Sequence, residues 1–233
     1  MMLPYFFDPT MILLLPALLL AGWAQLRVKS TFERYSHVGT RRGMTADRVA
    51  RMLLDRFGLT SVSVKRVAGQ LTDHYDPRDK SLSLSDSVYG NASIAAIGVA
   101  AHEVGHAIQN SVGYVPLGIR NNLVPVVNLG SFMAMPLFFI GFLFRGSLWM
   151  NIGIFLFLGV VIFHLVTLPV EFNASSRAVA ILEQTGALSG DELQGAGSVL
   201  NAAAWTYVAA TLMAVMQLLR LLALAALRRD SRD

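Results

Sequence analysis

The chain has 233 residues, of which 54% are hydrophobic and 15% are charged, whereas about 25% of the residues of a typical soluble domain are charged. Together with a mean hydropathy of +0.52, this composition argues against a soluble protein and predicts an integral membrane protein whose main partner is the lipid bilayer. The net charge is +4, and the positive residues cluster beside hydrophobic segments, which indicates membrane topology and no nucleic-acid partner. The chain has no cysteine, which excludes disulfides, cysteine-ligated zinc and thiol catalysis.

Residues 3–26 form the first long apolar stretch, and its most apolar part lies at 10–26. About 20 such residues span a bilayer, so we predict an N-terminal transmembrane helix within segment 1–27. The positive residues that follow are Arg27, Lys29, Arg34, Arg41 and Arg42. Because positive flanks remain in the cytoplasm, we expect the N-terminus outside the cell and the next segment inside it.

A helix and two strands are expected after this span. Residues 44–57 place apolar side chains on one face, which predicts an amphipathic helix. Residues 61–67 and Ser81–Ser85 alternate polar and apolar side chains, which predicts two strands, and the turn-forming residues 76–79 predict that the two strands pair as a β-hairpin. We expect Ser81–Ser85 to be an edge strand, which could hold a peptide substrate through main-chain hydrogen bonds.

The motif His102-Glu103-Val104-Gly105-His106 is an instance of the H-E-x-x-H pattern. Residues four apart lie on one face of a helix, so both imidazoles could bind one zinc ion, and Glu103 could act as general base on a zinc-bound water. A helix is expected over 93–109, because this stretch is rich in alanine and free of proline. The alternative, two ordinary helix histidines, is disfavoured because buried His and Glu side chains need partners. We therefore predict that segment 28–121 is a catalytic region.

Two residues that precede the predicted turn, His74 and Tyr75, are candidates for stabilising the oxyanion of a tetrahedral intermediate. A loop histidine is more often structural or merely exposed. His74 could also close the zinc site as a fourth ligand, which would make the site structural.

Residues 123–144 and 148–170 are each long enough to span a bilayer, so segment 122–170 is predicted to be a transmembrane hairpin. Because such a hairpin leaves and returns, it delivers Glu171 to the side of the membrane that holds the two histidines.

The last segment, 199–233, contains an apolar helix that Gln217 and Arg220 interrupt, and this helix could span the membrane fully or lie partly along the interface. In the preceding segment, 171–198, Ser189 and Glu192 have the form of a capping box.

A zinc site that performs hydrolysis needs three protein ligands and one open position, and Glu171 is the leading candidate for the third ligand. It follows Pro169, which suits a helix start or a kink. Ser175 lies one turn later on the same face, where it could hydrogen-bond to a ligand. The alternative for Glu171 is an ordinary carboxylate at a helix N-terminus, where the helix dipole favours it.

The stretches LTDHYDPRDKSLSLS, VYGNASIAAIGVAAHEVGHAIQ, LPVEFNASSRA and LNAAAWTYVAA resemble the YugP-type neutral zinc metallopeptidases, which are small bacterial membrane proteins. The resemblance implies a membrane zinc peptidase with His102, His106 and Glu171 as ligands and Glu103 as base. In the more distantly similar heat-shock and CAAX-type membrane zincins, an aspartate four residues after the ligand glutamate supports a zinc histidine. Here that position is Ser175. The neighbours Asn173 and Ser176 could share its task, and Arg177 could pair with a carboxylate or contact the substrate.

We therefore predict a mainly α integral membrane protein with about four hydrophobic helices and a small zincin-like α+β domain that carries a β-hairpin. With one Zn²⁺ per chain, it would hydrolyse membrane or membrane-associated proteins as a multi-pass protein of the bacterial cell membrane, with its active site on the cytoplasmic side. The rival hypothesis is a membrane scaffold or adaptor with a structural zinc site, which supports another protease through a membrane-protein partner. Structural zinc sites are usually rich in cysteine, and this chain has none.

Overall fold

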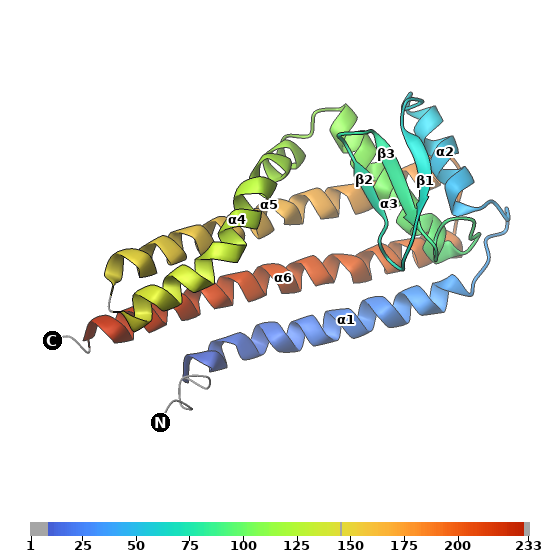
Figure 1. Cartoon of the computed structure of the whole chain (residues 1–233). Coiled ribbons are helices and arrows are strands. Elements are labelled where there is room, and N and C mark those ends of the chain that lie inside the picture. Colours follow the sequence, from blue (N-terminus) through green and yellow to red (C-terminus); the bar gives the residue numbers. More distant parts are fainter. Residues whose placement is uncertain (1–8, 145, 231–233) are drawn as a thin grey trace. The chain divides into compact units, whose positions relative to one another are not determined.

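The computed structural model describes residues 9–144 and 146–230. Residues 1–8 and 231–233, at the ends of the predicted first and last segments, lie outside the described residues, as does Arg145. The described elements, in chain order, are η2 (Pro9–Leu14), α1 (Leu15–Ser36), α2 (Ala46–Arg56), β1 (Ser63–Val67), β2 (His74–Asp76), β3 (Ser81–Ser85), α3 (Ile94–Ser111), α4 (Val115–Leu143), α5 (Ser147–Gln184) and α6 (Asp191–Asp230) (Figure 1).

Within the part of the chain that the structure describes, four helical segments are long and apolar enough to cross a membrane by their length and composition, namely Pro9–Ser36, Val115–Leu143, Ser147–Gln184 and Asp191–Arg228. The prediction of a mainly α fold with about four hydrophobic helices is therefore confirmed. The last helix, α6, runs without interruption through Gln217 and Arg220.

The chain forms two compact units. The helical unit consists of the described residues up to Trp23, those of Ile119–Leu168 and those from Tyr207, and its buried core includes Phe138, Met150 and Leu221. The mixed unit consists of Ala24–Gly118 and Pro169–Thr206. It contains the sheet, α2, α3 and every residue that the sequence predicted for the site.

The sheet has three strands in the order β1-β3-β2. β3 pairs antiparallel with β2, with Tyr75 opposite Leu82, so a β-hairpin is present before α3. Its first strand is β2, however, and β1 pairs with β3 in parallel. The predicted hairpin between 61–67 and 81–85 is therefore wrong.

The prediction that Ser81–Ser85 is an edge strand is also wrong, because β3 is the central strand and all five of its residues are buried. Two features explain the error. The three residues of β2 are too few to show an alternating pattern. The connection between β1 and β3 also contains β2, which forms the hairpin with β3. This long connection lets β3 pair with β1 in parallel, which a short hairpin turn would not allow.

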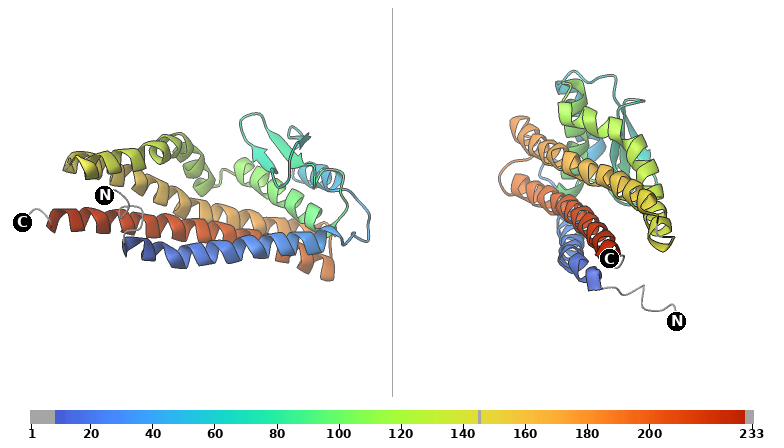
Figure 2. Two further views of the ribbon diagram at one scale, coloured as in Figure 1. Left: turned by 60° about the horizontal axis from the view of Figure 1, so that its bottom comes forward. Right: turned by 90° about the vertical axis from the view of Figure 1, so that its left-hand side faces the viewer.

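Helix α3 carries both histidines, which confirms the helix predicted over 93–109. Ser93 caps its N-terminus, because its side-chain Oγ accepts a hydrogen bond from the backbone N–H of Ala96 at 3.3 Å. α3 packs against α2 and against strands β2 and β3 (Figure 2). This packing buries nearly the whole helix, so polar side chains on α3 need partners within the protein.

Helix α5 packs closely on α3, and it continues through Pro169 without ending. Gly105 permits the contact, because a Cβ at this position would lie 2.6 Å from the carbonyl oxygen of Ala174. Glu171 therefore lies in the interior of a helix. The alternative explanation for Glu171, a carboxylate at a helix N-terminus, therefore does not apply.

The capping box expected from Ser189 and Glu192 does not form. α6 begins at Asp191, and Oε1 of Glu192 accepts a hydrogen bond from the backbone N–H of Arg41 at 2.6 Å. Glu192 is buried, so it connects the segment after α1 to the start of α6 within the mixed unit. The carboxylate of Glu192 thus accepts from a backbone N–H that is distant in sequence. A capping box would instead have it accept from the backbone N–H of Ser189.

Candidate metal centre

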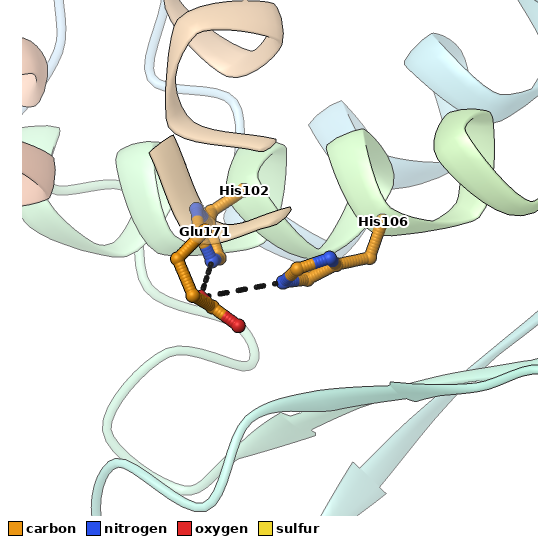
Figure 3. Close-up of side chains that lie close together, drawn as sticks. All are labelled: His102, His106 and Glu171. Atoms are coloured by element: carbon orange, nitrogen blue, oxygen red, sulfur yellow. Dashed lines mark hydrogen bonds and ion pairs between the residues drawn. The ribbon is translucent and has the colours of Figure 1, made fainter. Parts of the chain in front are cut away.

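Three side chains from two helices converge in the mixed unit (Figure 3). His102 and His106 of α3 and Glu171 of α5 each offer one ligand atom, and these atoms lie within 4.8 Å of one another. Oε2 of Glu171 lies 3.3 Å from Nε2 of His102 and 3.6 Å from Nε2 of His106. The structure thus brings together the three residues that the sequence proposed as ligands.

These separations fit a tetrahedral metal ion. Zinc bonds of about 2.0–2.2 Å at tetrahedral angles place neighbouring ligand atoms about 3.3–3.5 Å apart, close to both measured distances. Two imidazoles and one carboxylate are also a donor set typical of catalytic zinc, with the fourth position left open. The residues present therefore fit a zinc ion.

The other ring nitrogen of each histidine has a partner of its own. Nδ1 of His102 lies 3.1 Å from Oγ of Ser175, and Nδ1 of His106 lies 2.9 Å from Oε1 of Gln109. Such contacts fix the ring orientation of a metal-binding histidine. Ser175 was predicted from the sequence and Gln109 was not, because the only signal of Gln109 is its position one turn after His106 on the same helix face.

The electrostatic environment of the group is negative. Burial alone would lower the pKa of His106, but the nearby carboxylates of Glu171 and Glu103 outweigh it, so this pKa lies above its ordinary value. The Glu171 side chain is only 4% exposed, and a buried carboxylate is costly without a positive partner. Both facts favour a cation at this position.

Glu103 lies next to His102 in α3, and it is only 7% exposed. Its carboxylate makes no hydrogen bond to any residue that the structure describes. A carboxylate that is buried beside the ligands and not engaged elsewhere is well placed to accept a proton.

The two loop candidates lie in β2 and differ in orientation, because successive strand residues point to opposite faces. Oη of Tyr75 accepts a hydrogen bond from Nδ2 of Asn110 in α3 at 3.2 Å, and burial raises the pKa of the phenol. His74 is exposed, and its Nδ1 lies 2.8 Å from the carbonyl oxygen of Thr72. Among the residues described, the metal-binding group has three members, and His74 is not one of them.

The remaining candidates lie along α5. Nε of Arg177 donates a hydrogen bond to Oδ1 of Asn173 at 2.7 Å, and the same oxygen accepts a second one from Nε2 of Gln109 at 3.0 Å. Arg177 thus contacts an amide, and it forms no ion pair with the described carboxylates. Ser176 is exposed, so the structure connects Asn173 but not Ser176 to the histidines.

Comparisons with known proteins identify the family of the chain. The model of the family described as "Putative neutral zinc metallopeptidase" matches residues 10–226. The chain is also 50% identical over 209 residues to "Putative membrane protease YugP" of Bacillus subtilis (strain 168), and the match covers 89% of this chain and 92% of that protein. No solved structure matches the chain.

The chain therefore belongs to this family of neutral zinc metallopeptidases, which confirms the resemblance found in the sequence. Family membership implies zinc, and the group formed by His102, His106 and Glu171 is where the described residues could hold it.

Proposed function

We propose that the protein is a membrane-embedded, zinc-dependent peptidase that hydrolyses peptide bonds. The observation that carries this proposal is the convergence of His102, His106 and Glu171 beside the unengaged carboxylate of Glu103. Nε2 of each histidine and the carboxylate of Glu171 would hold one Zn²⁺ per chain. Zinc at this position would polarise a peptide carbonyl and lower the pKa of a water molecule toward about 7.

Glu103 is the proposed general base. Its carboxylate would take a proton from the attacking water and later deliver that proton to the amine nitrogen of the leaving group. The burial of Glu103 supports this role, because a carboxylate shielded from bulk water passes its proton to the substrate and not to solvent.

Strand β2 is the proposed site for the peptide backbone, in place of β3. Among the described strands, β2 pairs only with β3, so its other edge carries main-chain groups that can pair with an extended peptide. β2 also lies against α3, the helix of the two histidines. Tyr75, whose Oη accepts from Asn110, keeps its own proton for donation to a developing oxyanion.

Substrates are proposed to be membrane or membrane-associated proteins, cleaved on the cytoplasmic side of the bacterial cell membrane. Three observations support this. Among the described residues, four helical segments are apolar enough to span a membrane, and the similar Bacillus protein is named "Putative membrane protease YugP". The segments before and after Ile119–Leu168 also pack into one unit, as a membrane hairpin that leaves and returns requires.

The test is metal content and casein hydrolysis of the detergent-purified protein. Wild type should hold about one zinc and cleave casein. Glu103→Gln should hold zinc and be inactive, whereas Glu171→Ala should lose both zinc and activity. Glu183→Ala is the matched control, because Glu183 is an exposed carboxylate farther along the same helix, and it should behave as wild type.

Activity in Glu103→Gln would refute the role of Glu103. Tight zinc in every variant without cleavage of any substrate would favour the scaffold hypothesis. That hypothesis needs a fourth ligand, and the group formed by the described residues has three.

A further inference from the structure

Gln109 is fully buried, and the proposed chemistry makes no use of it. Its side-chain amide nevertheless makes three hydrogen bonds. Oε1 accepts one from Nδ1 of His106 at 2.9 Å, and Nε2 donates to the carbonyl oxygen of Val170 at 2.8 Å and to Oδ1 of Asn173 at 3.0 Å. All three lie within the usual range of hydrogen-bond lengths. Gln109 thus connects a proposed ligand on α3 to the turn of α5 that carries Glu171.

The orientation of the amide follows from the chemistry of its partners. A backbone carbonyl can only accept a hydrogen bond, and a guanidinium can only donate one. Val170 therefore requires that Gln109 present its NH₂ group to α5. Arg177, which donates to Asn173 at 2.7 Å, requires that Asn173 present its oxygen, and that oxygen in turn accepts from Gln109.

With its NH₂ group held on α5, Gln109 can present only its oxygen to His106. Nδ1 of His106 must then be the donor in that contact, and Nε2 of the neutral ring keeps its lone pair. Nε2 is the atom that lies 3.6 Å from Oε2 of Glu171. Two groups of α5 with fixed hydrogen-bonding roles, the Val170 carbonyl and the Arg177 guanidinium, thus define the tautomer of the histidine.

We propose that Gln109 is a positioning residue of the metal centre. It holds His106 in the tautomer whose Nε2 can bind a metal, and it fixes the distance between α3 and the Val170–Glu171 turn of α5. This inference rests on the proposed zinc site. Ser175 performs a weaker version of the same task for His102, because a hydroxyl can donate or accept and so does not impose one tautomer.

The experiment compares zinc dissociation constants, measured by competition with a chelator on detergent-purified protein. Gln109→Met keeps the approximate size of the side chain and removes all three hydrogen bonds. It should weaken zinc binding about 10- to 100-fold, as is typical when a partner of a metal-binding histidine is lost. It should also change the visible absorption spectrum of the Co²⁺-substituted protein, which reports the geometry of the ligands independently of activity.

Ser93→Ala is the control for a general loss of stability, since it removes the N-terminal cap of the same helix and should lower Tm while leaving the zinc dissociation constant unchanged. Ser175→Ala should weaken zinc binding less than Gln109→Met. A dissociation constant for folded Gln109→Met within about threefold of wild type, well below the expected loss, would overturn the inference and leave the proposed peptidase function intact. Wild type that binds no zinc would overturn both.

If Gln109→Met does not fold, two variants at Asn173 decide the question. Asn173→Asp preserves the oxygen that Gln109 and Arg177 contact, whereas Asn173→Leu removes it. The Leu variant should bind zinc more weakly than the Asp variant, and equal affinities would refute the positioning role.

Discussion

Gly105 in α3 lies so close to Ala174 in α5 that a Cβ at position 105 would stand 2.6 Å from the carbonyl oxygen of Ala174. The obstacle is backbone, so it cannot rotate away. The separation of the two helices at this contact is therefore set by the absence of a side chain, and the distance from Glu171 to the histidines depends on it.

Gly105→Ala should force the two helices apart. We expect a loss of stability of about 1–3 kcal/mol, as for an overpacked core, together with reduced zinc content. Gly118→Ala is the control, because a Cβ at this helical glycine meets no atom within 4 Å, and it should leave zinc content unchanged. Zinc analysis and thermal unfolding of both variants provide the measurement. Full zinc content in Gly105→Ala would show that the contact does not set the ligand geometry.

Tyr75→Phe tests the proposed oxyanion donor. We expect kcat to fall about 100-fold, as when a comparable donor is removed from an oxyanion hole, with zinc content unchanged. Because burial raises the pKa of Tyr75 above its ordinary value, the phenol should keep its proton throughout the neutral and mildly alkaline range. His74→Ala should have wild-type activity, since His74 is exposed. If His74→Ala lowered kcat and Tyr75→Phe did not, His74 would be the oxyanion donor in place of Tyr75.

Zinc binding to the metal-free protein should release protons. The pKa of His106 lies above its ordinary value, so near neutral pH part of the metal-free protein carries a protonated His106. Zinc must displace that proton. Affinity should therefore rise with pH until the pH exceeds this raised pKa, and fall as the pH decreases through it. Calorimetric titration in buffers with different ionisation enthalpies measures the release, and heats that do not depend on the buffer would contradict the prediction.

The proposed topology can be tested in a natural cysteine-free background, because the chain contains no cysteine. Glu183→Cys in the mixed unit and Ser147→Cys at the start of α5 both replace exposed residues. A membrane-impermeant maleimide should label Ser147→Cys in intact cells, and should label Glu183→Cys only in inverted vesicles. Labelling of Glu183→Cys in intact cells would place the proposed active site outside.

The sequence predicted the helices well, because long apolar stretches and the alanine-rich flanks of His102 are strong local signals. It also selected Glu171, because a hairpin of two spans can return only to the side from which it left. The candidate group was therefore accessible to reasoning from spacing and topology.

The missed features all depend on tertiary contacts. β2 has three residues, and it is a strand only because β3 lies beside it. Gln109 would be an ordinary exposed residue on an isolated helix, and its polar contacts in the folded chain are with Val170 and Asn173 of another helix. Glu192 had a local capping motif, but the backbone N–H of Arg41 competes for its carboxylate, and no pattern within that helix indicates a donor so distant in sequence.

The mixed unit is discontinuous in sequence, since Ala24–Gly118 and Pro169–Thr206 are separated by Ile119–Leu168. A nascent chain that has reached Gly118 already contains both histidines and Glu103, but it lacks the third proposed ligand. The intervening helices must be synthesised before Glu171 can join them. The order of synthesis therefore keeps the proposed peptidase inactive until α5 has been made and its metal centre can be completed.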